Sequence, residues 1–275
     1  MIFQSYRPTY PLNIFIDSLF YYEGLSPAHA LDRFLPDGNT EIIFDLTENT
    51  QHIYDNETLA AIQACCHAWV SGVRTRPITI PSGKGSRMLV VAFRKGKAYP
   101  FYPLPINEIT DTVVRAELIF GNRILDLREQ LLAVRSIDEM FPLVEKFLFH
   151  QTGDSLFMDS SANCIEYAVS KILHGPNLLS LQQLSDQIGY SQKHFIDLFR
   201  KKVGVPPKQY LKIMRFQKTI REIENQRTLH WSDLALESGY YDQAHFINDF
   251  KTFSGFTPGE YLKRKSPLLN YIPVG

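Results

Sequence analysis

The stretch GYSQKHFIDLFRKKVGVPPKQYL, residues 189–211, recurs as GYYDQAHFINDFKTFSGFTPGEYL at residues 239–262. The second copy carries one extra residue near its start, after which equivalent positions lie 51 residues apart. Identical residues at this spacing are His194 and His245, Phe195 and Phe246, Phe199 and Phe250, Gly204 and Gly255, Pro207 and Pro258, and Tyr210 and Tyr261. Self-similarity of this kind indicates that one supersecondary unit occurs twice.

Each copy follows a short segment with apolar residues at helical spacing. These segments are residues 181–188, with Ser180 as the expected N-cap, and residues 231–238. A glycine comes next in both, which suits the left-handed conformation that often closes a helix. Ser191 and Asp242 then stand where a second helix needs an N-cap. Helix, tight glycine turn and second helix together predict a helix-turn-helix in each copy.

The second helix of each unit has one apolar face. Phe195, Leu198 and Phe199 share this face in the first unit, and Phe246 and Phe250 share it in the second. We expect these side chains to pack inward and to leave the opposite face for a DNA groove. The outward residues are Lys193, Ile196, Asp197 and Arg200 in the first unit, and Gln243, Ala244, Ile247, Asn248 and Lys251 in the second.

A longer helix should join the two units. Pro207 is suited to open it, and helical spacing continues from about Lys208 to Asn225. At 1.5 Å per residue this helix is roughly 27 Å long. That length suits two reading helices that enter successive major grooves about one DNA turn apart.

The second copy closely resembles the signature of the AraC/XylS family of transcription regulators, G-F/Y-x-D-Q-S-H-F-x-R-x-F-K…G-x-T-P-x-x-Y. With the first copy, the resemblance covers about 100 residues ending near Lys265. It implies seven helices, a monomer that reads two adjacent major-groove segments of promoter DNA, RNA polymerase as a partner, and activation of transcription. It also implies base-edge contacts from Lys193, Ile196, Asp197, Gln243, Ala244, Ile247 and Asn248.

Two positions depart from the family pattern. Asn248 replaces the usual arginine, and Asp197 faces DNA where a basic or amide group is commoner, so neither unit offers a bidentate arginine-to-guanine contact. Asp197 could accept a hydrogen bond from a cytosine amine or simply repel phosphate. The candidates for phosphate contacts, whose alternative role is a solvated helical surface, are Ser191, Arg200, Lys201, Lys202, Lys208, Lys212, Arg215 and Lys251.

The first half of the chain has a different pattern. Up to about residue 120, short segments rich in β-branched and aromatic residues alternate with turn sequences, which predicts a β-rich sandwich or barrel. Residues 122–150 then show two amphipathic helices. We therefore expect an α+β protein with a β-rich domain at 1–150, a linker at 151–163, and an all-helical DNA-binding domain at 164–268. Everything after the linker is expected to be helical.

The β-rich half resembles, more loosely, the cupin-like sensor domains that precede such DNA-binding modules. Residues 35–44 and 71–76 carry this resemblance, which implies a small-molecule effector. In such proteins the helices after the barrel often dimerise, so residues 122–150 are a candidate homodimer surface, with a plain role in covering the barrel as the alternative. Arg74 and Arg76, two apart on an expected strand, are candidate effector ligands for an anion, with a surface pair as the alternative.

Charge separates the two halves. The formal net charge is zero, but residues 160–275 hold 15 Lys and Arg against 10 Asp and Glu, which leaves 14 against 19 for residues 1–159. The basic part is therefore the one with the repeat, as expected for a DNA-binding domain. Without a long apolar run or a signal-peptide layout, and with three cysteines that suggest no disulfide framework, the sequence predicts a cytoplasmic protein.

Two other functions compete with this interpretation. A cupin-type metalloenzyme fused to a DNA-binding module would need metal ligands, but there is no H-x-H pair, and no G-x-S-x-G nucleophile elbow or phosphate-binding loop occurs. We therefore expect no enzyme activity, no metal and no cofactor. A protein-interaction scaffold is the second alternative. Salt discriminates here, because binding through phosphate contacts weakens steeply as salt rises whereas an apolar interface hardly responds.

Overall fold

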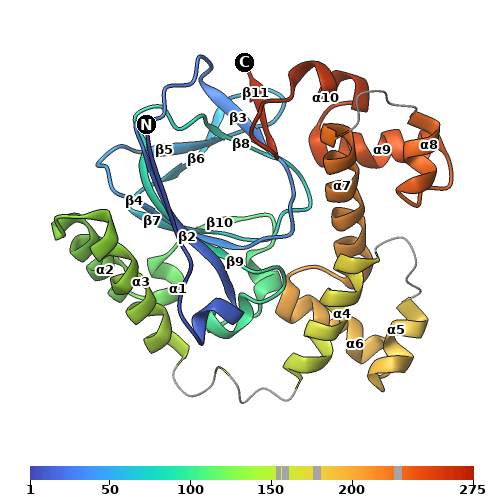
Figure 1. Ribbon diagram of the computed structural model, residues 1–275, viewed down its shortest axis with the longest axis horizontal. Helices are drawn as coiled ribbons and strands as arrows, with labels where there is room; N and C mark the ends of the chain where they lie inside the picture. The colour runs from blue at the N-terminus through green and yellow to red at the C-terminus, as the bar shows by residue number, and fades with distance from the viewer. Residues whose placement is uncertain (153–155, 157–160, 176–180, 226–230) are drawn as a thin grey trace.

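The computed structural model describes residues 1–152, 156, 161–175, 181–225 and 231–275. A β-rich part and a helical part lie side by side (Figure 1), so the α+β class with a β-rich first half is confirmed. The expected linker, residues 151–163, falls largely on 153–155 and 157–160, outside the described residues. The expected cap at Ser180 lies outside them too.

Two antiparallel sheets make up the β-rich part. The six-stranded sheet, in spatial order, consists of β1 (Ile2–Tyr6), β2 (Ile16–Glu23), β9 (Arg87–Phe93), β4 (Glu41–Asp45), β7 (Ala68–Ser71) and β10 (Val113–Arg115). The five-stranded sheet consists of β11 (Tyr271–Val274), β3 (Leu31–Phe34), β8 (Ile78–Pro81), β5 (Gln51–Tyr54) and β6 (Ala61–Cys65). Short 3-10 helices lie between strands at η1 (Leu12–Ile14), η2 (Tyr99–Phe101) and η3 (Ile106–Ile109).

The six-stranded sheet has two faces with separate cores. Because side chains alternate along a strand, Ile42 of β4 and Leu89 of β9 point to one face and join the main core. Ile43 and Val90, one position further on, point to the other face and form a small cluster toward the five-stranded sheet. The space between the two sheets is thus lined by a different set of residues from the helix-covered face.

Helices cover the first of these faces. They are α1 (Glu117–Phe120), α2 (Arg123–Ala133) and α3 (Ile137–Thr152). The two helices expected within 122–150 are therefore confirmed. Their apolar stripes, which include Ile124, Leu131, Phe141 and Leu148, are buried in the main core. These apolar stripes cover the sheet. Self-association through the outer faces of the two helices stays a prediction.

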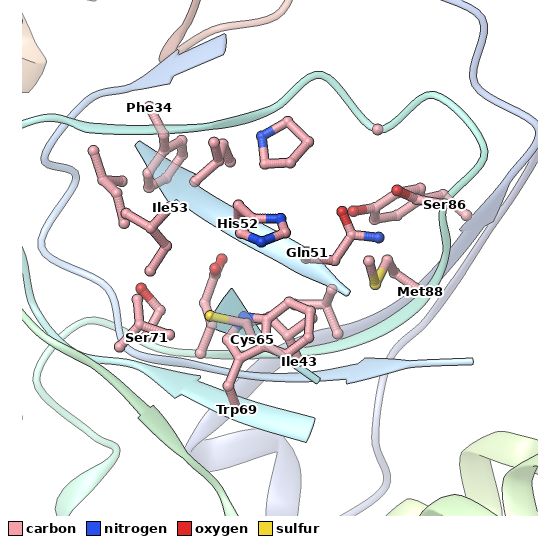
Figure 2. Close-up of a pocket in the computed structure, with 18 of the residues that line it drawn as sticks. Phe34, Ile43, Gln51, His52, Ile53, Cys65, Trp69, Ser71, Ser86 and Met88 are labelled. Atoms are coloured by element: carbon pink, nitrogen blue, oxygen red, sulfur yellow. The ribbon is translucent and has the colours of Figure 1, made fainter. Parts of the chain in front are cut away.

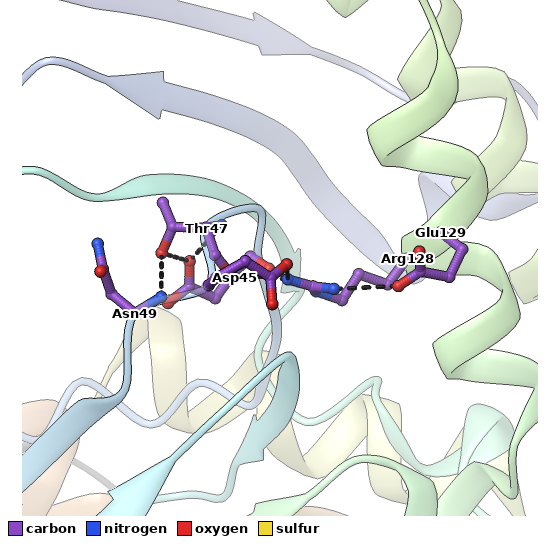
Figure 3. A network of polar contacts seen from close by, with 6 residues as sticks. Asp45, Thr47, Asn49, Arg128 and Glu129 are labelled. Atoms are coloured by element: carbon purple, nitrogen blue, oxygen red, sulfur yellow. Dashed lines mark hydrogen bonds and ion pairs between the residues drawn. The ribbon is translucent and has the colours of Figure 1, made fainter.

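Arg128 fastens α2 to the loop after β4 (Figure 3). Its side chain is 3% exposed. Its Nε donates to the carbonyl oxygen of Asp45 at 2.7 Å, and Nη2 donates to that of Thr47 at 2.7 Å. The carboxylates of Glu48 and Glu129 each lie 3.1 Å from the guanidinium. A buried cation with this many partners is satisfied and fixes the helix to the sheet.

Seven helices follow within the described part of the second half, as the resemblance implies. They are α4 (Ala162–His174), α5 (Leu181–Ile188), α6 (Gln192–Val203), α7 (Pro207–Asn225), α8 (Trp231–Glu237), α9 (Gln243–Ser254) and α10 (Pro258–Arg264). The pairs α5–α6 and α8–α9 are the two expected helix-turn-helix units. They lie near opposite ends of α7 (Figure 1), which confirms the joining helix.

The expectation that everything after the linker is helical is wrong at the C-terminus. Residues 271–274 form β11, which pairs antiparallel with β3 as the edge of the five-stranded sheet. The register places Tyr271 opposite Phe34 and Val274 opposite Leu31. A four-residue segment that contains Pro273 is too short for a periodicity argument, and its partner strand lies more than 230 residues away in the sequence.

The helical part packs directly on the β-rich part. Thr110 donates to the carbonyl oxygen of Gly204 at 2.7 Å, where η3 meets the end of α6. From the middle of α7, Gln217 Nε2 donates to the carbonyl oxygen of Pro36 at 2.8 Å. Apolar residues from both parts share one core. Leu35 of the β-rich part belongs to it, together with residues of α7 such as Ile213. The position of the helices relative to the sheets is therefore set by specific contacts.

Candidate nucleic-acid interface and β-domain cavity

The two turns have the geometry that the sequence predicts. Gly189 and Gly239 adopt φ values of +77° and +79°, a region that glycine enters without steric cost. Ser191 accepts a hydrogen bond from the backbone N–H of His194 at 3.3 Å, and Asp242 accepts one from that of His245 at 2.7 Å. Both N-caps are therefore confirmed, and each reading helix starts at a fixed point.

The apolar faces of α6 and α9 point inward. Phe195, Phe199 and Phe246 are fully buried, and Phe250 is nearly so. Within each helix the two rings, four residues apart, meet edge to face at 5.8 Å between centroids. Such pairs add to the burial of the rings themselves. The packing turns the opposite face of each helix outward.

Most of the predicted base-facing residues lie on these outward faces. Lys193, Gln243, Ala244 and Asn248 are exposed, and Asp197 is half-buried. Ile196 and Ile247 are half-buried because they pack against the core of the helical part. Each set is brought together on one helix, as the spacing requires. Their contacts with bases stay predictions.

Asp197 does not stand alone on its helix. Its carboxylate lies 2.9 Å from Lys201 Nζ and 3.7 Å from Arg200 Nη2. The hydrogen bond from Lys201, together with the nearby positive charges, lowers the pKa of Asp197. Asp197 therefore occupies two of the cations that the sequence assigns to phosphate contacts.

The predicted phosphate-contacting residues fall into two groups. Most are exposed, although Asp197 engages Arg200 and Lys201: Ser191, Arg200, Lys201, Lys208 and Lys251. Lys212 and Arg215 are half-buried, and Lys212 Nζ lies 3.1 Å from the Asp249 carboxylate. Lys202 is only 8% exposed, and its Nζ lies 4.0 Å from the centroid of the Tyr99 ring. In this arrangement Lys202 belongs to the contact between the two parts of the protein.

The histidines of the repeat have local packing partners. The His194 ring meets the Tyr190 ring at 4.8 Å, and the His245 ring meets that of Tyr240 at 5.3 Å. Nowhere in the described residues do three His, Cys, Asp or Glu side chains gather as a metal site would require. Among those same residues, no helix is both long and apolar enough to cross a membrane.

A cavity of about 130 Å³ lies between the two sheets (Figure 2). The inward positions of the six-stranded sheet line one side, among them Ile43, Trp69 and Met88. Phe34 and Ile53 line the other side, from the five-stranded sheet. The alternation described above explains the cavity, because the inward residues of the two sheets form only small clusters and do not fill the space between them.

Polar side chains interrupt this apolar lining. Glu41, Ser71, Gln51 and His52 line the cavity, and so does Tyr271 of the C-terminal strand. Figure 2 shows the rings of His52 and Trp69 and the amide of Gln51 around the open space. Sequence reasoning did not select these residues. The signal that could have found Glu41 is its place two residues before Ile43, on the inward face of an alternating strand.

Arg74 and Arg76, the predicted effector ligands, lie elsewhere. Neither is among the residues that line the cavity. Arg74 is buried and donates from Nη2 to the carbonyl oxygen of Thr112 at 3.1 Å, which ties the segment after β7 to the segment before β10. Burial lowers the pKa of its guanidinium.

Comparison with known families places the two parts separately. A family model described as a helix-turn-helix domain matches residues 184–264, and one described as a domain of unknown function (DUF6597) matches residues 4–115. An uncharacterized HTH-type transcriptional regulator of Staphylococcus aureus is 27% identical over 141 residues, which are 51% of this chain and 18% of the relative. The chain thus spans less than a fifth of the length of that relative.

Other alignments with this chain cover a larger share of the relative's length. The HTH-type transcriptional activator AarP of Providencia stuartii is 32% identical over 85 residues, 31% of this chain and 62% of AarP. Among solved structures, ToxT from Vibrio cholerae aligns over 96% of this chain and 98% of its own, with 10% identity and a TM-score of 0.47. The C-terminal domain of AraT from Geobacillus stearothermophilus aligns over 38% and 88%, with 20% identity and a TM-score of 0.35.

Two capped helix-turn-helix units on a shared helix, next to a β-rich domain, define a two-domain helix-turn-helix protein. Residues 184–264 match the helix-turn-helix family model, and residues of this part are similar to AarP, so the resemblance to AraC-type proteins seen in the repeat is confirmed.

Proposed function

We propose that the protein regulates transcription by binding promoter DNA through both helix-turn-helix units. The observation that carries this proposal is the doubled, capped unit with its aromatic rings inside and its polar residues outside. The helices α6 and α9 would enter adjacent major grooves, and the exposed lysines and arginines would meet phosphates. Activation of transcription, through contact with RNA polymerase, extends the proposal by analogy with the activator AarP.

The cavity of the β-rich domain is the proposed effector site. It is concave, mostly apolar, and carries a few convergent polar groups, as small-molecule sites generally do. A homodimer through the outer faces of α2 and α3 is a further proposal, which sedimentation of the protein at two concentrations would test. Glu129 and Gln130 are exposed on those faces, where a second copy of the chain would contact them.

Selection from a random DNA pool with the full-length protein, at two salt concentrations, tests DNA reading. We expect enrichment of a two-part site whose halves lie about one helical turn apart. Salt-sensitive binding without enrichment would reduce the proposal to non-specific DNA binding. Salt-insensitive retention or none would favour a scaffold for protein interactions.

Two residues of α9 separate base reading from phosphate binding. Gln243 and Lys251 are both exposed, and they lie on the same helix. Gln243→Ala should change the preferred base at one position by roughly 1–3 kcal/mol. Lys251→Ala should weaken binding to every sequence alike and reduce the salt slope by about one. Selection and salt titration of both variants measure this; uniform weakening by both would contradict the assigned roles.

A further inference from the structure

The cavity between the sheets has one carboxyl and no Lys or Arg among its described lining residues, and His52 is the one basic side chain there. Glu41 carries the only carboxyl, and neither Lys nor Arg takes part in the lining. Ser71, opposite Glu41 in the register of β4 and β7, is uncharged. A cationic ligand therefore finds a carboxyl partner in the lining, whereas an anionic one finds neither Lys nor Arg.

The Glu41 carboxyl has no hydrogen-bond or ion-pair partner in the part of the chain that the structure describes. Arg74 and Lys95 act on it only at longer range. Each of these cations is held by other groups: Arg74 by Thr112, and Lys95 by Asn39 at 3.0 Å. Because burying an unpaired carboxylate in an apolar cavity costs free energy, Glu41 is suited to accept a cationic partner.

Aromatic rings surround the same space from both sheets. Phe20, Tyr22 and Trp69 line it from the six-stranded sheet, and Phe34 and Tyr271 line it from the five-stranded sheet. The face of an aromatic ring carries partial negative charge and attracts a cation, and cages of such rings recognise alkylated ammonium groups. A carboxyl together with several rings is a combination that favours a compact organic cation over a neutral or anionic molecule.

We propose that the cavity binds a small organic cation, of the substituted-ammonium class, whose positive charge pairs with Glu41 and packs against the surrounding rings. The cavity volume of about 130 Å³ is close to that of cavities known to hold benzene, so the ligand is a compact one. This inference gives a chemical class to the effector site of the proposed function.

A pH dependence follows from the protonation of Glu41. Burial, reinforced by the charge of Asp37 and opposed by Lys95 and Arg74, raises the pKa of Glu41 to about 8. The other titratable groups of the lining are Tyr22, His52, Cys65 and Tyr271. At pH 6.5 the carboxyl is mostly protonated and must lose its proton to pair with a cation. Affinity for a permanently charged ligand should therefore rise, by about 20-fold between pH 6.5 and 8.5.

Calorimetric titration of the full-length protein, without DNA, tests the proposal with three isosteric probes. They are choline, the neutral 3,3-dimethylbutan-1-ol and the anionic 3,3-dimethylbutanoate. We expect choline to bind at least tenfold more tightly than either isostere. Glu41→Gln should remove most of this preference and the pH dependence, whereas Glu57→Gln, at an exposed site, should change neither.

Preference for the neutral or anionic probe would overturn the proposal, and so would the absence of binding by all three up to about 20 mM. The comparison of probes on the unaltered protein decides even where Glu41→Gln does not fold. Because DNA is absent, failure here leaves the proposed DNA binding intact, and failure to bind DNA leaves this result intact.

Discussion

Asp197 is an acidic residue on the helix that we propose to enter the first DNA groove. It lies on the outward face of α6 and holds Lys201 at 2.9 Å and Arg200 at 3.7 Å. In the absence of DNA these pairs are solvent-exposed and contribute little to stability. Their effect on binding is larger, since a cation engaged by a carboxylate must be shared with or taken from it before it neutralises a phosphate.

Asp197→Asn should therefore strengthen binding to all DNA sequences, by about 3- to 10-fold at moderate salt, and steepen the salt dependence. Titration of a selected site and a scrambled one measures both effects. The opposite result, weaker binding confined to sites with cytosine at one position, would mean that the carboxylate accepts from a cytosine amine.

Among the secondary-structure elements, α2 is attached to the sheet by apolar packing and by one buried cation. Ile124, Leu127 and Leu131 pack on the sheet, but Arg128 on the same side reaches the loop after β4 and donates to two carbonyl oxygens there. A helix that only packed could slide, because apolar contacts are not directional. The guanidinium fixes its position (Figure 3).

Arg128→Met should lower the free energy of unfolding by about 3 kcal/mol, because it keeps the apolar stem but leaves buried carbonyl oxygens without a donor. Urea unfolding followed by tryptophan fluorescence measures this. Arg123→Met is the matched control on the same helix, since Arg123 is exposed and should change stability by less than about 0.5 kcal/mol. Equal losses in both variants would contradict an anchoring role.

Elements held by local signals were predictable from sequence, and those held by distant contacts were not. The caps at Ser191 and Asp242 and the inward rings of α6 depend on residues within one or two turns. By contrast, a leucine-rich pattern gives no sign that Arg128 is buried. Likewise, nothing near Lys202 shows that it meets Tyr99 of the other domain. The same holds for the cavity, which exists only where two sheets face each other.

In the molecule as a whole, β11 connects the DNA-binding part to the cavity. Alternation along this strand sends Tyr271 to the cavity and Ile272 to the core shared with the helices. Asn270, just before them, accepts from Gln217 of α7 at 2.8 Å and from the backbone N–H of Leu35 at 2.9 Å. We therefore expect a change at Tyr271 in the cavity wall to be felt by Ile272, which packs among the helices.

We predict that this arrangement couples the cavity to DNA binding, and linkage requires that DNA then influence the cavity as strongly as the cavity influences DNA binding. Trp69 lines the cavity and can report on it once the second tryptophan is removed by Trp231→Phe. DNA titration should change the fluorescence of Trp69. Tyr271→Ala should reduce that change by more than half while DNA affinity stays within about threefold. Pro273→Ala, on the same strand but outside the cavity lining, should preserve the fluorescence change. An undiminished change in Tyr271→Ala would mean that the coupling runs through another contact, such as that of Lys202 with the Tyr99 ring.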